Sequence, residues 1–409
     1  MNSPACFYTL VFSGATHNAF YQYRGPTTNS DALFRLSYKT KAIKALREEI
    51  ERSDGNVSDE ILLCMILLAS QANGEKRAPP EHRDTTPLST AQDAQYYATN
   101  KWEWSHMMAL RRLITQRGGL QTIKIYGLAF GIASFDTHTA LMLLTKPLFP
   151  PLMPSSTVLS TWSTSHDSPT IVFHSRLISG FDFLAQNRLP PAMELYSVLC
   201  NMRDLIVGLY RWQNGYKDSP DIRQIVWARN LNQHELLSLP DLSEEFASPS
   251  LGAKGQLQDE VSKQEDLAVY ELCRLTTLAF QFLVLLPYLH TSQTPDRLAE
   301  IMIRCLQHCK DVMSFEKREL YHDLLSWATL LGAWLANRAS LRLWFVQFLG
   351  GLVQSPNLET QSEISWDSAR TKMSRFLWLD SQCDEPCREI WDEACQIEIP
   401  EGQWSCIVS

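Results

Sequence analysis

Apolar side chains recur every three to four residues along most of this chain, the period that places them on one face of an α-helix. Alternating Val, Ile and Thr segments bounded by hairpin turns, which would indicate β-strands, are scarce. The pattern therefore predicts an all-α fold, a multi-helix array of about a dozen helices. No fixed-period internal repeat indicates a solenoid.

Three connections rich in Pro, Ser and Thr interrupt the helical pattern, at residues 73–90, 150–169 and 240–256. Domain boundaries are expected in such segments, because they lack the apolar periodicity of a packed helix. The middle connection offers a division of the array into two subdomains.

Local start signals agree with the helical pattern. Ser58 is a predicted N-cap for a helix over 61–72, and Asp59-Glu60 supply negative charge to its first turn, where the helix dipole favours it. Ser219-Pro220 and Thr294-Pro295 are also predicted starts, each a capping hydroxyl followed by proline at the first helical position.

The most distinctive helix is predicted over Trp102 to Arg117. At about 100° per residue, one arc of it gathers Trp102, His106, Met107, Ala109, Leu110, Leu113 and Ile114. Gly118 suits the left-handed position that ends a helix, because it has no Cβ to clash, and Gly119 allows a tight turn. We expect this helix to dock its apolar arc on a core and to stop at the two glycines.

Arg117 also projects from the apolar arc, and a buried guanidinium needs a carboxylate or several carbonyls to offset its desolvation. A second helix is predicted over 128–144, and it carries Asp136. Our hypothesis is an ion pair between Arg117 and Asp136 that fixes the packing of the two helices. The alternative is that the polar residues on the arc contact a ligand.

Several elements follow in a set order before residue 150. They are a helix over 32–47, Asp59-Glu60-Ile61-Leu62, Trp102-x-Trp104-x-His106, Arg117-Gly118-Gly119-Leu120, Asp136, and Pro147-x-Phe149-Pro150. Their order and spacing resemble the regulatory domain of fungal-specific transcription factors. The rest of the chain resembles that family only as a helical array of suitable length.

The resemblance implies that residues 1–150 are the N-terminal part of this regulatory domain and residues 151–409 its C-terminal helical part. It implies a nuclear transcriptional regulator without catalysis, which acts through protein partners of the transcription machinery or through a small apolar effector. Large aromatic residues could line an effector pocket or simply fill a core; they include Trp102, Trp212, Trp227, Trp327, Trp334 and Trp344.

The family normally carries a DNA-binding binuclear zinc cluster. Such a cluster needs six thiolates, supplied as two Cys-x-x-Cys pairs and further cysteines, and no Cys-x-x-Cys occurs among the 10 cysteines of this chain. We therefore expect no direct DNA binding, as in a truncated gene product, a shortened gene model or a regulator that has lost its DNA-binding module. The net charge of -8 adds no general attraction to nucleic acid.

Other cysteines give weaker metal signals. Cys305, His308 and Cys309 have the i, i+3, i+4 spacing that could face one zinc ion, but no fourth ligand is evident. The spacing of Cys383, Cys387, Cys395 and Cys406 lacks the short pairs of a zinc site. In both groups we favour structural or free thiols, and we expect neither a metal nor another cofactor.

Two charged segments carry further hypotheses. Residues 380–404 mix acidic and bulky apolar residues, which is typical of activation segments, although a solvated amphipathic helix is the interpretation we favour. The basic run of Arg35, Lys39, Lys41, Lys44 and Arg47 could contact phosphates, but its spacing matches an exposed helix face.

Sequence features typical of several other classes of protein are absent from the chain. No uninterrupted apolar run approaches the ~20 residues of a membrane helix, and the N-terminus lacks the basic start of a secretory signal. Nucleotide-binding glycine loops, HExxH, GxSxG, kinase motifs and the DDxxD motif of terpene cyclases are absent. We expect an intracellular protein that is not an enzyme; the alternative is an all-α metabolic enzyme or small-molecule-binding protein unrelated to transcription.

Overall fold

The computed structural model describes residues 3–22, 29–70, 86–89, 91, 104–163, 167–187, 189–241, 257–286, 293–354 and 365–397. Every regular element in these ranges is a helix, so the all-α prediction is confirmed. The chain forms two compact units. Unit 1 comprises Met1–Arg83, Gln92–Ala140 and Pro147–Leu152, and unit 2 comprises Asp84–Ala91, Leu141–Lys146 and Met153–Ser409.

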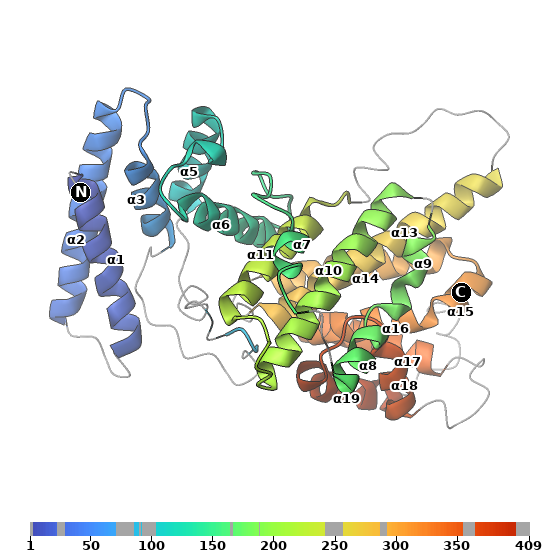
Figure 1. The fold of residues 1–409 in the computed structure, drawn as a ribbon. Coiled ribbons are helices and arrows are strands. Elements are labelled where there is room, and N and C mark those ends of the chain that lie inside the picture. The colour runs from blue at the N-terminus through green and yellow to red at the C-terminus, as the bar shows by residue number, and fades with distance from the viewer. Residues whose placement is uncertain are drawn as a thin grey trace. The chain divides into compact units, whose positions relative to one another are not determined.

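Unit 1 is built from helices that pack in sequence order. They are α1 (Pro4–Gln22), α2 (Asn29–Arg52), α3 (Asp59–Ser70), α5 (Trp104–Arg117), the short 3-10 helix Leu120–Thr122, and α6 (Leu128–Leu143), whose last turn belongs to unit 2. Helix α1 packs on α2 and on α3, and α3 packs on α5 (Figure 1).

The apolar arc of α5 faces the core of unit 1, as its periodicity predicts. Met107, Leu110 and Ile114 are buried there with residues of α3 such as Leu62. Ala109 is exposed, so its predicted place on the buried face is wrong. Ala109 lies at the edge of the arc, where a small side chain leaves the helix free to rotate slightly toward its larger residues.

The start signals have mixed outcomes. Ser58 accepts a hydrogen bond from the Ile61 N–H at 3.3 Å, as predicted for an N-cap. A helix does begin beside Ser219-Pro220, but Ser219 is not its cap: Asp221 caps α11 and completes a capping box with Gln224. Helix α14 does begin at Thr294, but the Thr294 hydroxyl donates to the Met142 carbonyl at 3.0 Å and does not cap its own helix.

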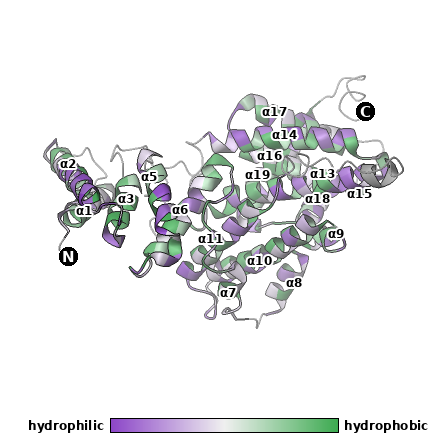
Figure 2. Ribbon diagram, turned by 90° about the horizontal axis from the view of Figure 1, so that it is seen from above, coloured by the Kyte–Doolittle hydropathy of each residue, from purple (hydrophilic) through white to green (hydrophobic). Residues whose placement is uncertain are grey.

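Unit 2 contains the longer array. Its helices are α7 (Ser155–Leu159), α8 (Ser168–Arg176), the 3-10 turn Ser179–Phe181, α9 (Asp182–Ala185), α10 (Pro190–Gln213), α11 (Ile222–Ser238), α13 (Leu257–Phe280) with the π-helical turn Gln281–Leu285, α14 (Thr294–Val312), α15 (Phe315–Leu320), α16 (His322–Leu335), α17 (Ala339–Val353), α18 (Trp366–Met373) and α19 (Asp380–Gln396). Hydrophobic and hydrophilic residues alternate along most of these ribbons (Figure 2).

Helix α13 is central to unit 2 and packs against α10, α11, α14 and α16. Its stretch Ser262–Leu285 is long and apolar enough to cross a membrane, yet the apolar window is 100% buried within the fold. This burial is the behaviour of a core helix in a large helical domain.

Candidate functional site

The family resemblance defines a structural signature that consists of Trp102, Trp104, His106, Arg117, Gly118, Gly119 and Asp136. Of these, Arg117 lies at the end of α5 and binds α3. Its Nη2 forms an ion pair with Asp59 Oδ1 at 2.5 Å, and its guanidinium donates to the carbonyls of Val57 (3.1 Å) and Thr122 (2.8 Å). The hypothesis of an Arg117–Asp136 pair is therefore wrong. Asp59 itself lies in the first turn of α3, as predicted, but it faces the protein interior.

Asp136 instead binds Arg111, which is not part of the predicted apolar arc of α5. Arg111 Nε lies 3.0 Å from Asp136 Oδ1. The other carboxylate oxygen accepts the N–H groups of Leu148 (2.7 Å) and Phe149 (3.0 Å). One buried carboxylate on α6 therefore binds both α5 and the segment Pro147–Pro150. The residues that carry the resemblance in this region hold helices and loops together.

The two glycines end α5 as predicted. Gly118 and Gly119 both have φ of 100°, a region that disfavours side chains with a Cβ. The Gly119 N–H donates to the Ile114 carbonyl at 2.9 Å and the Gly118 N–H to the Thr115 carbonyl at 3.1 Å, the hydrogen-bond pair of a Schellman motif.

The aromatic start of the signature comprises Trp102, Trp104 and His106. Trp102 lies outside the described residues. Trp104 is the first residue of α5, and His106 is half-buried in its first turn. Of the predicted signature, the described part thus has structural roles at Arg117, Gly118, Gly119 and Asp136.

The cysteine candidates are apolar packing groups. Cys305 and Cys309 face the core, where both thiols approach the Ala268 carbonyl, at 4.0 and 3.5 Å. The hydrogen bond with Cys309, together with burial, raises the pKa of Cys305. Cys383 and Cys387 are buried, Cys395 is exposed, and Cys406 lies outside the described residues. Within the described ranges no group of three or more His, Cys, Asp or Glu side chains could hold a metal ion.

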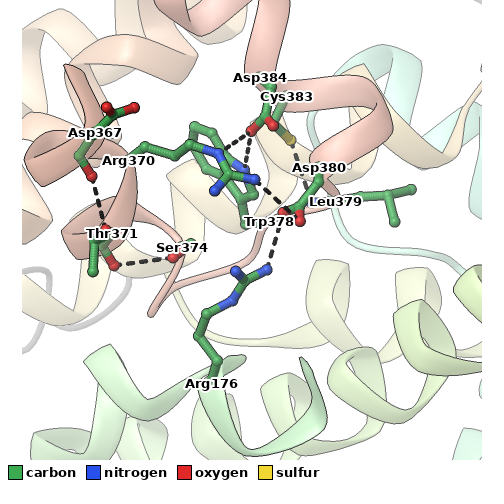
Figure 3. A network of polar contacts seen from close by, with 10 residues as sticks. All are labelled: Arg176, Asp367, Arg370, Thr371, Ser374, Trp378, Leu379, Asp380, Cys383 and Asp384. Carbon is green, nitrogen blue, oxygen red and sulfur yellow. Dashed lines mark hydrogen bonds and ion pairs between the residues drawn. The ribbon is translucent and has the colours of Figure 1, made fainter. Parts of the chain in front are cut away.

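The acidic segment near the C-terminus forms α19 over residues 380–396. Its apolar side chains are buried, namely Cys383, Cys387, Ile390, Trp391 and Ala394. Its carboxylates bind other helices: Arg370 of α18 contacts Asp380 (3.1 Å) and Asp384 (2.9 Å), and Arg176 of α8 reaches Asp380 at 2.9 Å (Figure 3). This arrangement favours the amphipathic-helix interpretation, because the bulky residues of α19 are not presented to a partner.

The basic run lies on α2, where the structure favours the exposed-face interpretation. The Lys41 ammonium lies 5.0 Å from the centre of the Tyr38 ring, and Arg47 pairs with Glu51 one turn later. Leu33 and Leu36 on the same helix are 66% and 60% exposed, so this part of α2 is not a core-facing stripe.

A partly open cavity of about 330 Å³ lies in unit 2 and is large enough for a small ligand. It is lined by the end of α11, the second half of α13, the first half of α14 and residues 144–146. Seven of its thirteen lining residues are aliphatic: Leu144, Leu237, Leu239, Leu275, Leu278, Leu298 and Ile301. Such a mixed surface suits a small molecule with an apolar body.

A buried ion pair lies in the wall of this cavity. Glu271 and Arg274, on one face of α13, are 5% and 8% exposed. The Arg274 Nε and Nη2 groups donate to the two oxygens of Glu271 at 2.8 and 2.6 Å. Burial raises the pKa of Glu271 and its bonds to Arg274 oppose that rise, while Glu271 helps to raise the pKa of Arg274 despite burial.

The third guanidinium nitrogen of Arg274 is not used in this pair. Nη1 forms no hydrogen bond with any described residue. It is also not fully enclosed by protein atoms, so it is accessible to solvent. Arg304, exposed on α14, lines the same cavity and forms no ion pair with the described residues. Lys146 and Asp241 complete its charged lining.

The sequence did not single out this cavity. Of the two interpretations of the tryptophans, the core one describes Trp327, which is fully buried and packs on Phe181 and Phe376 in unit 2. Trp344 stacks on Phe348, and no tryptophan lines this cavity. The only local signal was the Glu271-x-x-Arg274 spacing, which on most helices marks an exposed pair.

Comparison with known proteins adds no relative to this geometry: no family model, no curated protein and no solved structure matches the chain.

Proposed function

We propose that this chain is a transcriptional regulator of the fungal-specific type, without its own zinc cluster, whose helical region binds a small effector and contacts proteins of the transcription machinery. The observation that supports the proposal is the cavity of about 330 Å³ beside α13. Seven aliphatic and five charged residues line it, so it offers both an apolar surface and polar groups that could orient a small molecule.

A regulator of this kind changes transcription when it is brought to a promoter. The test is to fuse the full chain to an unrelated DNA-binding domain and to measure a reporter gene in a fungal host. We expect the fusion to change reporter output relative to the DNA-binding domain alone, and an epitope-tagged chain to accumulate in the nucleus. Output equal to that of the DNA-binding domain, with exclusion from the nucleus, would refute the proposal.

A matched pair of variants connects the output to the cavity. Ile301→Trp places a large ring at the half-buried cavity wall, whereas Leu343→Trp makes the same change at a 49% exposed position of α17 away from it. The first should remove the response of the reporter to an effector, and the second should retain it. Binding of a ligand by a chain that never acts on transcription would support the alternative, a small-molecule-binding protein or enzyme.

A further inference from the structure

We infer that the cavity of unit 2 takes a small apolar carboxylate, whose anionic head is held by Arg304 and by the unused Nη1 of Arg274. This inference rests on the proposed function only in placing the effector in that cavity. It is carried by the charges and the volume of the lining.

The charge of the lining favours a single negative charge. Arg274, Arg304 and Lys146 are opposed by Asp241 and Glu271, which leaves one positive charge in excess. The Glu271 carboxylate is already bound to two nitrogens of Arg274, so the pair is neutral as a whole. Arg304 is exposed and has no ion-pair partner among the described residues, so its charge is available to an anion in the cavity.

The guanidinium of Arg274 is held in a fixed orientation. Its guanidinium is planar and forked, so two bonds to Glu271 fix the plane in which Nη1 points. A donor that is more than nine-tenths buried, and still free to bond, is unfavourable unless water or a ligand accepts its hydrogens. A carboxylate oxygen is the acceptor that bonds a guanidinium most strongly.

The volume and the apolar lining of the cavity indicate the size and the aliphatic character of the ligand. At about 30 Å³ per water-sized group, the cavity of about 330 Å³ holds about eleven such groups. Six leucines and Ile301 are among its thirteen lining residues, and no described aromatic ring lines it. The best fit is a flexible or branched aliphatic chain that ends in one carboxylate, and octanoate, with about ten non-hydrogen atoms, is a suitable probe.

The experiment is a titration of the purified full chain with octanoate, followed by calorimetry and by the shift in melting temperature. Octan-1-ol and octylammonium serve as probes of equal length with a neutral and a positive head. We expect octanoate to bind at least about tenfold more tightly than either, which is the effect of one or two charge-assisted hydrogen bonds. Equal affinity for the three probes, or no binding of octanoate, would overturn the inference.

Variants locate the head group. Arg304→Gln removes an exposed charge without disturbing the core, and it should weaken octanoate about tenfold while leaving octan-1-ol unchanged. Arg388→Gln is the control, because Arg388 is a 65% exposed arginine of α19 that does not line the cavity. An equal loss in both variants would show a general charge effect, and it would contradict the assigned contact.

The outcome is separable from that of the reporter assay. Octanoate binding with the expected selectivity in a chain that leaves transcription unchanged would refute the regulator and keep the ligand class. A reporter response that depends on the cavity, combined with a preference for octylammonium or octan-1-ol, would keep the regulator and refute the carboxylate.

Discussion

The corrected pairing of unit 1 makes a quantitative prediction about Arg117 and Asp59. Asp59→Ala would remove an ion pair of 2.5 Å and two bonds that the carboxylate accepts, from the N–H groups of Lys124 (2.6 Å) and Ile125 (2.8 Å). Asp59 is only 8% exposed, so its loss leaves a poorly hydrated guanidinium and two amides without acceptors. Breaking a buried pair from one side typically costs about 3–5 kcal/mol, and we expect about 4 kcal/mol here.

Arg117→Met should cost less, about 2 kcal/mol, because Asp59 keeps its two backbone donors. The double variant Asp59→Ala with Arg117→Met should show a coupling of about 1–3 kcal/mol, since each single variant already removes the shared ion pair. The same cycle for Arg117 and Asp136 should be additive to within about 0.5 kcal/mol, because these two residues share no bond and no partner.

Urea unfolding followed by circular dichroism measures the cycles. Because the chain has two compact units, hydrogen exchange at the amides of Lys124 and Ile125 should be measured in parallel to report on unit 1 alone. Coupling between Arg117 and Asp136 as large as that between Arg117 and Asp59 would refute the pairing described above. The cycle of Arg111 with Asp136, which form a 3.0 Å pair, is the positive control.

The same site predicts a pH dependence of stability. Burial alone would raise the pKa of Asp59, but the N–H groups of Ile125 and Lys124 and the Arg117 guanidinium outweigh it and lower that pKa. A carboxyl group with a lowered pKa in the folded state contributes stability above its unfolded pKa, about 3.9, and loses it as pH falls through the folded value. Unit 1 should therefore weaken below about pH 4, and Asp59→Asn should flatten that part of the profile.

Three further substitutions or reactions test the packing. Gly332→Ala should destabilise unit 2 by about 1–3 kcal/mol in urea unfolding, because the new Cβ would overlap the Phe345 ring. Gly14→Ala meets no atom within 4 Å on α1, so it should stabilise unit 1 by about 0.5–1 kcal/mol in the same assay; a loss would contradict this packing. Iodoacetamide should label the exposed Cys395 in the folded protein, whereas Cys383, whose burial raises its thiol pKa, should react only after unfolding, as peptide mass spectrometry would reveal.

The elements of unit 1 were predictable because their signals are local. Three- to four-residue periodicity, the Ser58 cap and the two glycines after Arg117 act within one or two helical turns, so they fix helices α3 and α5 without knowledge of the fold. The ion pairs were not predictable in this way. Arg111 and Arg117 are six residues apart and so project about 120° from one another on α5, which sends them to α6 and α3 respectively.

The cavity could not be predicted from the sequence for a related reason. Its lining comes from four segments between residues 144 and 304, and no periodic pattern relates residues so far apart. Its two charged groups on α13, Glu271 and Arg274, also match the i, i+3 spacing of an ordinary surface pair. Only their burial, at 5% and 8% exposure, distinguishes them.

The burial of the Glu271–Arg274 ion pair is informative about its role. An ion pair removed from water contributes little net stability, because desolvation offsets most of the attraction, and apolar residues of similar volume often stabilise a fold as well. Glu271 and Arg274 lie on a helix whose other buried positions are mostly aliphatic, so packing alone would favour replacing them. What apolar residues could not supply is a guanidinium held in a fixed plane by its bonds to Glu271. The carboxylate site that we propose would give the pair a role that the stability of α13 does not.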